Sequence, residues 1–199
     1  MKHKITGIII GTFLLTAAGQ VNATPVQWTL AAGGNDHWYN LIDAPYTSWS
    51  DANTSANALS FGNLDGHLAT ITSAAENDFI FNILGVSDRP IWLGGFQDEN
   101  AAEPLADWQW VTGEAWTFTN WESDEPNNST WNDEDALSFA FWEAKGTWND
   151  APTEWEYYDT GGYVVEYESA PVPEPATMTL FGIGLISIAG HRFRKKTRK

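Results

Sequence analysis

The sequence predicts one α+β domain, in which two early helices are followed by several short strands. Segments 48–59 and 73–84 place apolar residues at helical spacing. From residue 90 onward, short apolar or alternating segments between turn residues are typical of strands. Twelve tryptophans supply the aromatic surface of a packed core, which argues against disorder in so acidic a chain.

The first part of the domain is expected to hold a strand and a capped helix. Residues 26–34 alternate weakly and predict the strand, which residues 37–43 continue or pair with. Thr47 or Ser48 is the expected N-cap of the first helix, because its hydroxyl accepts from a free backbone N–H. The apolar face of that helix holds Trp49, Ala52, Ala56 and Leu59.

A short strand over 66–73 is expected to lead into the second helix. Ser73 and Glu76 have the spacing of a capping box, in which each side chain satisfies the other's backbone N–H. Gly85 is suited to end the helix, because glycine adopts the left-handed conformation at low cost. The apolar face holds Phe79, Ile80, Ile83 and Leu84.

The second part of the domain is expected to be built from strands, some of them antiparallel. These are predicted at 90–95, at 107–113 with a turn at its end, at 135–150 folded about a Lys145–Gly146 turn, and at 161–169. The segment from Gln97 to Asp133 is largely irregular. A loop of this length usually carries function.

The N-terminus has the three-part layout of a secretory signal peptide. Two lysines precede an apolar run over 5–18, and the small residues Val21 and Ala23 occupy the positions that signal peptidase reads. We expect export, with residues 1–23 removed. An N-terminal membrane anchor is the alternative, but the apolar run is short for a span of about 20 residues.

The last segment, residues 171–199, begins with a Pro-Glu-Pro step at 173–175 and continues as an apolar run over 176–190. A basic tail follows, with Arg192, Arg194, Lys195, Lys196, Arg198 and Lys199. This order closely resembles the PEP-CTERM sorting signal of Gram-negative bacteria. The resemblance implies an exosortase as processing partner, a transient inner-membrane tether, and residence in the cell envelope or the exopolysaccharide matrix of a biofilm. A plain C-terminal membrane anchor is the alternative.

Between these ends, residues 24–170 are strongly acidic and contain no cysteine. Only Arg89 and Lys145 oppose 25 acidic residues, which gives the segment a formal net charge of −23. Nucleic acid and anionic membrane surfaces are therefore poor partners, whereas divalent cations are good ones. The lack of cysteine excludes disulfides, thiolate zinc sites and cysteine nucleophiles.

Short motifs follow one another along this segment in a fixed order. They are Gly66-His67-Leu68-Ala69-Thr70-Ile71, Trp92-Leu93-Gly94-Gly95, Trp108-Gln109-Trp110-Val111-Thr112-Gly113, Glu125-Pro126-Asn127, Glu134-Asp135, Trp148-Asn149-Asp150 and Tyr163-Val164-Val165-Glu166. Together they resemble the C-type lectin-like domain over essentially the whole segment. The resemblance implies that family's fold, with two helices, small antiparallel sheets and a long calcium-binding loop region.

The chain departs from this family at the cysteines. The family's disulfides involve positions that here look like Ala136, Ala151 or its neighbours, and Val165. Each missing bridge removes roughly 2–4 kcal/mol of stabilisation, so apolar packing is expected to fill the space instead.

Residues 120–135 hold six carboxylates, four asparagines and no basic side chain, so the loop repels itself. Calcium takes about six to eight oxygen ligands of these kinds. The resemblance implies one Ca²⁺ held by Glu125, Asn127, Glu134, Asn149 and Asp150, with the backbone carbonyl of Asp150 as a further ligand. It also implies a cis bond before Pro126. An ordinary trans turn in an acidic loop is the alternative.

The resemblance further implies that Ca²⁺ binds two neighbouring hydroxyls of a mannose-type carbohydrate. Carboxylates accept from such hydroxyls and amides donate to them, a role that falls to Glu125, Asn127, Glu134 and Asn149. Trp131 is a candidate for stacking on the sugar, and Trp148 is a weaker one. The expected ligands of a second ion are Asp98, Glu103, Asn128 and Asp135, for which a solvated acidic surface is the alternative.

Two other classes of function were compared with the lectin. Glycosidases also use a pair of carboxylates, but this cluster holds many more carboxylates than such a pair. The sequence also has no Ser-His-Asp set, so no enzyme is expected. The stronger competitor is a lectin-like structural or protein-interaction module of the matrix that binds no sugar. The five intact ligand positions favour the lectin.

Overall fold

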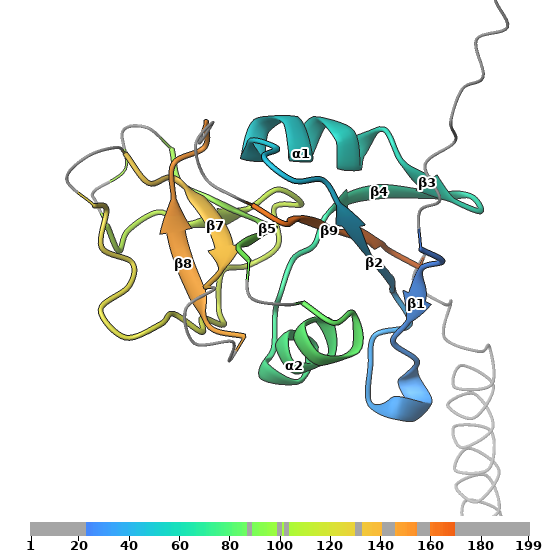
Figure 1. Cartoon of the computed structure of the whole chain (residues 1–199). Helices are drawn as coiled ribbons and strands as arrows, with labels where there is room; N and C mark the ends of the chain where they lie inside the picture. The colour runs from blue at the N-terminus through green and yellow to red at the C-terminus, as the bar shows by residue number, and fades with distance from the viewer. Residues whose placement is uncertain are drawn as a thin grey trace, which may run out of the picture.

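A computed structural model describes residues 23–86, 89–98, 101, 104–129, 133–140, 146–154 and 160–169. Within these ranges two α-helices, one short 3₁₀ helix and nine strands form a single α+β unit (Figure 1). The predicted signal peptide before Ala23 and the predicted sorting signal lie outside the described residues. No helix in the described ranges is long and apolar enough to cross a membrane.

The N-terminal segment forms β1 (Val26–Gln27), a 3₁₀ helix (Leu30–Ala32) and β2 (Trp38–Asp43). The prediction of a strand continuing to Gly34 is wrong. The Thr29 hydroxyl accepts from Ala32 N and caps the 3₁₀ turn, and Asp36 Oδ1 accepts from Leu30 N at 2.8 Å. Local side-chain bonds of this kind compete with a sheet ladder.

The first helix, α1 (Trp49–Asn57), begins after Ser48, whose hydroxyl accepts from Asp51 N at 3.1 Å. The predicted cap and face are confirmed, with Leu59 lying just beyond the helix. The following strands are β3 (Ser60–Phe61) and β4 (Leu64–Leu68), joined as a hairpin. The predicted strand over 66–73 therefore starts earlier and ends earlier than expected.

The second helix, α2 (Ala74–Ile83), begins after Ser73 and is followed by Gly85 in the left-handed conformation, as predicted. The capping box is only half formed. Ser73 Oγ accepts from Glu76 N at 3.2 Å, but the Glu76 carboxylate accepts from Thr72 N at 2.7 Å.

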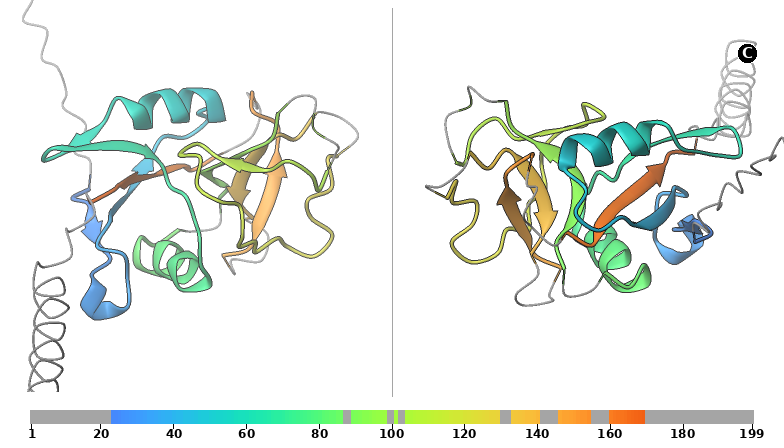
Figure 2. Two further views of the ribbon diagram at one scale, coloured as in Figure 1. Left: turned by 180° about the vertical axis from the view of Figure 1, so that it is seen from behind. Right: turned by 45° about the horizontal axis from the view of Figure 1, so that its top comes forward.

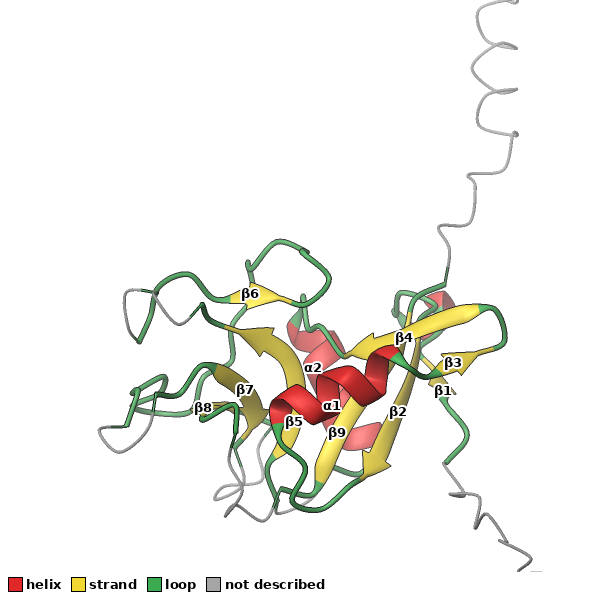
Figure 3. Cartoon of the chain, turned by 90° about the horizontal axis from the view of Figure 1, so that it is seen from above, coloured by secondary structure: helices red, strands yellow, loops and turns green. Residues whose placement is uncertain are grey.

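The remaining strands are β5 (Ile91–Phe96), β6 (Gln109–Trp110), β7 (Ala136–Phe139), β8 (Trp148–Ala151) and β9 (Gly162–Tyr167). The main path through the sheet runs β1-β2-β9-β5-β7-β8. All its pairs are antiparallel except β5 with β9, which is parallel and which the sequence did not predict. Figure 3 shows β5 and β9 side by side across the middle of the molecule.

Strand β9 is the centre of the fold, because it is buried on both faces. Its side chains alternate, so Val164 belongs to the core cluster that contains Ile80 of α2, whereas Val165 belongs to the cluster that contains Trp49 of α1. The two helices accordingly lie on opposite sides of β2 and β9 (Figure 1).

Apolar residues occupy the positions where the family resemblance places cysteines. Ala136 of β7 and Ala151 of β8 are paired across the two strands, and both are buried. Val165 is fully buried in the cluster with Ala52 and Ala56. At these three positions, apolar packing and strand pairing hold the structure together.

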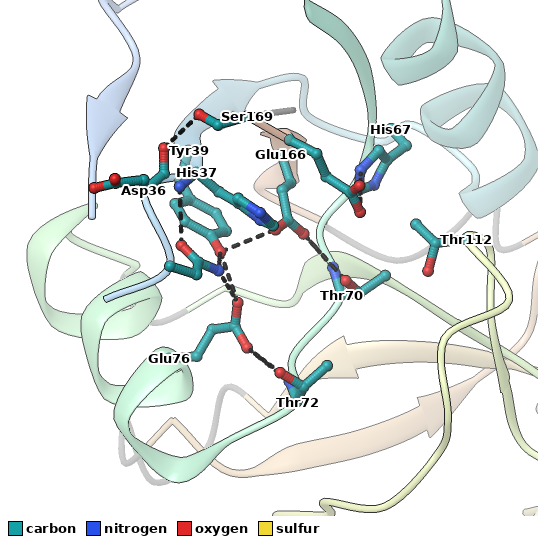
Figure 4. A network of polar contacts seen from close by, with 12 residues as sticks. Asp36, His37, Tyr39, His67, Thr70, Thr72, Glu76, Thr112, Glu166 and Ser169 are labelled. Carbon is teal, nitrogen blue, oxygen red and sulfur yellow. Dashed lines mark hydrogen bonds and ion pairs between the residues drawn. The ribbon is translucent and has the colours of Figure 1, made fainter. Parts of the chain in front are cut away.

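A buried polar network ties the N-terminal segment, α2 and β9 together (Figure 4). The Tyr39 hydroxyl lies 2.6 Å from Glu76 Oε1 and 2.9 Å from Glu166 Oε1. Glu166 also contacts His37 Nδ1 at 2.7 Å and accepts from Thr70 N at 3.0 Å. Burial raises the pKa of Glu76, and the nearby Glu166 carboxylate adds to the increase.

Gly162 is expected to be irreplaceable, because a Cβ there would lie 1.9 Å from Ile42 O in β2 and its φ is +139°. Gly162→Ala should lower the free energy of unfolding by about 3 kcal/mol or more. Gly62→Ala is the matched control, since φ is +63° but no atom lies within 4 Å, and it should cost about 1 kcal/mol. Urea unfolding measures both, and equal losses would contradict this packing.

Candidate functional site

The candidate site lies in the irregular segment between β6 and β7, beside β7 and β8 and away from β1 (Figure 2). Tryptophans hold this segment against the sheet. Trp116 stacks on Trp108 at a centroid distance of 5.7 Å and lies 4.4 Å from Trp110, while Trp121 packs edge-on against Trp148 at 5.8 Å. The Glu125–Pro126 bond is cis, as the resemblance implied.

Asp150 of β8 holds the turn that follows this proline. Its side chain is fully buried, and its carboxylate accepts from Asn127 N at 3.0 Å and from Asn128 N at 2.8 Å. A carboxylate that accepts two backbone N–H groups fixes the backbone strongly. The conformation of the turn therefore depends on where β8 places Asp150.

Glu134 closes the other side of the loop. Its Oε2 accepts from Ser129 N at 2.6 Å, and its own N–H donates to Asn128 Oδ1 at 2.9 Å. The side chain is nearly buried, at 7% exposure. The two ends of the loop are thus joined through Glu134.

Glu125, Glu134 and Asp150 form a group of carboxyls that interact electrostatically. Burial raises the pKa of Glu125 to about 8, and the neighbouring carboxyl of Asp150 and the charge of Glu134 contribute. Burial also raises the pKa of Glu134 to about 7, with a contribution from Asp150. For Glu125 and Glu134, burial is the larger cause of the raised pKa, and the neighbouring carboxylates add to it.

The oxygen chemistry of this group suits a hard divalent cation. Glu125 Oε2 is buried and accepts from no donor in the part of the chain that the structure describes. Such an atom gains a partner when a cation binds, and Ca²⁺ prefers carboxylate and amide oxygens. The residues present therefore fit the ion that the resemblance implied.

The side chains are not arranged as a finished metal site. Among the described residues, no group of three or more Asp, Glu or His side chains has a metal-holding arrangement. Asp150 is turned toward the backbone of the loop, and the Asn149 amide donates to Asp150 O, the carbonyl expected to bind the ion. The Asn149 amide would have to release this carbonyl to bind metal as predicted.

The residues predicted for the second ion are only partly placed. An open hollow of about 500 Å³ is lined, in the described part of the chain, by Asp98, Ala101, Asp107, Trp108 and Gln109. Gln97 N donates to Asp135 O at 2.9 Å, which sets Asp98 near Asp135, but Asn128 is engaged with Glu134 and Asp133. Glu103 lies outside the described residues.

The two tryptophans considered for sugar stacking have different outcomes. Trp148 is fully buried, so the suggestion that it contacts a sugar is wrong. Its indole N–H instead donates to Asn77 Oδ1 at 2.8 Å. Trp131 lies outside the described residues. Glu76-Asn77 belongs to the family resemblance at the start of the second helix, but the sequence assigned Asn77 no role in the site; an asparagine next to the apolar face of α2 was a usable signal.

The comparisons with known proteins agree with this architecture. Residues 47–158 match the family model of the lectin C-type domain, and residues 171–195 match that of the PEP-CTERM protein-sorting motif. The chain is 29% identical to a C-type lectin of Micrurus corallinus over 146 residues, which cover 71% of this chain and 84% of that protein.

Two further similarities have different coverage. The chain is 32% identical to halomucin of Haloquadratum walsbyi over 144 residues, which cover 66% of this chain but only 1% of halomucin. The crystal structure of the C-type lectin CEL-I from Cucumaria echinata matches with a TM-score of 0.55 at 25% identity, covering 67% of this chain and 91% of CEL-I.

The raised pKa values predict how pH changes the stability of the metal-free protein. With a chelator present, the free energy of unfolding should fall as the pH rises from about 5 to about 8. The folded protein keeps protons on Glu125 and Glu134, with pKa values of about 8 and about 7, that the unfolded chain releases near pH 4.5. Urea unfolding followed by tryptophan fluorescence measures the effect.

Glu125→Gln isolates the cause, since glutamine copies the protonated carboxyl and cannot ionise. This variant should be more stable than the wild type near pH 8 in chelator and should show a flatter pH profile. Asp65→Asn, at an exposed position in β4, is the control and should keep the wild-type profile. A profile for Glu125→Gln as steep as that of the wild type would rule out this origin.

Proposed function

Because the chain belongs to the C-type lectin domain family, we propose that it is an exported protein that binds carbohydrate through a calcium ion. The observation that carries this proposal is that the carboxyls of Glu125, Glu134 and Asp150 interact electrostatically at the Glu-Pro-Asn turn. Their mutual repulsion and the buried, unpartnered Oε2 of Glu125 both favour a cation there.

We assign five residues to the ion: Glu125, Asn127, Glu134, Asn149 and Asp150. The three carboxylates carry a charge of −3, which one Ca²⁺ reduces to −1. Binding would offset both the burial and the repulsion that raise the pKa values of Glu125 and Glu134. It would also replace the contact between the Asn149 amide and Asp150 O.

Bound Ca²⁺ supplies a Lewis-acidic position for two neighbouring sugar hydroxyls. The four residues assigned to orient those hydroxyls are Glu125, Asn127, Glu134 and Asn149, whose carboxylates accept and whose amides donate. We propose a mannose-type sugar, from the Glu-Pro-Asn order, with Trp131 as a stacking contact. Exposure of Asn127 at the rim of the turn supports access for a polysaccharide.

A second calcium ion is proposed beside the first, at Asp98, Glu103, Asn128 and Asp135. The hollow over Asp98 supports it, as does the pairing of Gln97 N with Asp135 O. This ion would reduce the charge of the same acidic loop region.

The sorting motif over 171–195 implies processing by an exosortase and export to the cell envelope or beyond. We propose that residues 1–23 are removed as a signal peptide, that residues 24–170 form the lectin domain, and that residues 171–199 tether it transiently to the inner membrane of a Gram-negative bacterium. The final location would be the exopolysaccharide matrix, and the net charge of residues 24–170 argues against nucleic acid as a partner.

We propose no catalytic role for the carboxyls of Glu125, Glu134 and Asp150, because the chain matches the family model of the lectin C-type domain. A structural or protein-interaction module of the matrix is the second candidate. One observation favours it: the oxygens of Asp150 are already engaged by the protein's own N–H groups. Dependence on calcium separates the two candidates.

Retention on immobilised mannose tests the proposal. The protein should be retained in calcium and released by a chelator. Glu125→Gln combined with Asn127→Asp should weaken retention by about tenfold or more. The double substitution exchanges the carboxylate at 125 for an amide and the amide at 127 for a carboxylate, so each sugar hydroxyl meets the opposite hydrogen-bonding group. Asp65→Asn, on an exposed strand position, should be retained like the wild type. If a chelator does not change retention, calcium does not bind the sugar. If the protein is retained on none of the sugars tested, the protein-interaction module is favoured.

A further inference from the structure

Asn77 is a buried polar residue on α2, away from the acidic loop. Its side chain is 2% exposed, and both ends of its amide are used. Nδ2 donates to Gly146 O at 2.9 Å, and Oδ1 accepts from Trp148 Nε1 at 2.8 Å. Asparagine supplies a donor and an acceptor in one small group, and here each finds a partner on the chain that leads into β8.

The start of β8 is fixed against α2 at this point. Gly146 O also accepts from Asn120 Nδ2 at 2.8 Å, and Trp148 N donates to Asn120 O at 2.8 Å. A Cβ on Gly146 would lie 2.9 Å from the Phe81 ring and 3.2 Å from Asn77 Nδ2, so the backbone approaches the helix as closely as glycine permits.

The next two residues of β8 belong to the candidate calcium site. Asn149 and Asp150 follow Trp148 directly, and the Asp150 carboxylate accepts from the N–H groups of Asn127 and Asn128. A displacement of Trp148 along or across the strand would move Asp150 with it. The turn that carries Glu125 and Asn127 would then lose its anchor.

Packing alone does not fix this position. The Trp148 ring meets Trp110, Trp121 and Phe118 edge-on, with centroid distances of 5.9, 5.8 and 5.5 Å. These are apolar contacts without a preferred donor direction, whereas the indole N–H must meet an acceptor when it is buried. Asn77 Oδ1 is that acceptor, so it selects the orientation of the ring.

We infer that Asn77 is a positioning residue for the acidic loop: through Gly146 and Trp148 it sets the place of Asp150, and thereby the turn proposed to bind calcium. The inference deepens the proposed function and rests on it for the metal. Its geometric part, the anchoring of the turn, can be measured without any ion.

Amide hydrogen exchange of the metal-free protein tests the geometric part. Asn77→Leu removes both hydrogen bonds and should increase the exchange rates of the Asn127 and Asn128 amides by about tenfold. Asn82→Leu is the matched control on the same helix, because Asn82 is exposed and, in the described part of the chain, its amide donates to Asp78 O of α2 at 2.8 Å. The control should leave these two amides unchanged.

Trp148→Phe keeps the experiment decisive if Asn77→Leu fails to fold. Phenylalanine retains an aromatic ring and removes only the N–H, so a smaller increase of about threefold is expected. A folded Asn77→Leu or Trp148→Phe that protects Asn127 and Asn128 like the wild type would overturn the inference.

Calcium titration of the same variants tests the consequence for the ion. Asn77→Leu should weaken calcium binding by about tenfold, and Asn82→Leu should bind like the wild type. A merely structural role would lower the midpoint of thermal unfolding and leave the calcium affinity of the folded protein unchanged, which would count against the inference. If the wild type binds no calcium but Asn77→Leu still exposes the two amides, the proposed function fails and the anchoring stands.

Discussion

Desolvation and mutual repulsion of the carboxyl groups of Glu125, Glu134 and Asp150 are the constraint on which the acidic end of the molecule depends. Two carboxylates about 4 Å apart repel by roughly 4 kcal/mol at an effective dielectric constant near 20. Burial, with this repulsion added to it, raises the pKa of Glu125 to about 8 and that of Glu134 to about 7, so both groups tend to hold protons in the metal-free loop. A divalent cation would answer the same repulsion without protons. If the loop binds calcium as proposed, proton and cation compete for the same carboxyl groups.

Such a repulsive loop needs a rigid support, and the support here contains no cysteine. Tryptophans pack the irregular segment onto the sheet, and β7 and β8 are joined through the buried pair of Ala136 and Ala151. At the opposite end, the contacts of Tyr39 with Glu76 and Glu166 link the N-terminal segment to α2 and β9. Aromatic packing and buried polar contacts take the part that the family resemblance assigns to disulfides.

Local chemistry predicted local structure well. Ser48 and Ser73 begin their helices because a hydroxyl accepts from a free N–H, and that information lies within three residues. The parallel pair of β5 and β9 escaped prediction because it joins segments about 70 residues apart. The place of Asp150 escaped it too, since it depends on Asn77 of α2, which no pattern around Asp150 reveals. The carboxylates and amides of the loop could be read from the sequence, but their contacts in the metal-free loop could not, because these depend on the fold.

Calorimetric titration of the protein with calcium near neutral pH, repeated in buffers that differ in ionisation enthalpy, tests most directly whether calcium and protons share the carboxyls of Glu125 and Glu134. Because Glu125 and Glu134 hold protons in the metal-free loop, we predict saturable binding of calcium accompanied by release of protons. No binding up to roughly millimolar calcium would contradict the assignment of this loop to the ion. Binding without proton release would contradict the claim that proton and cation share one site.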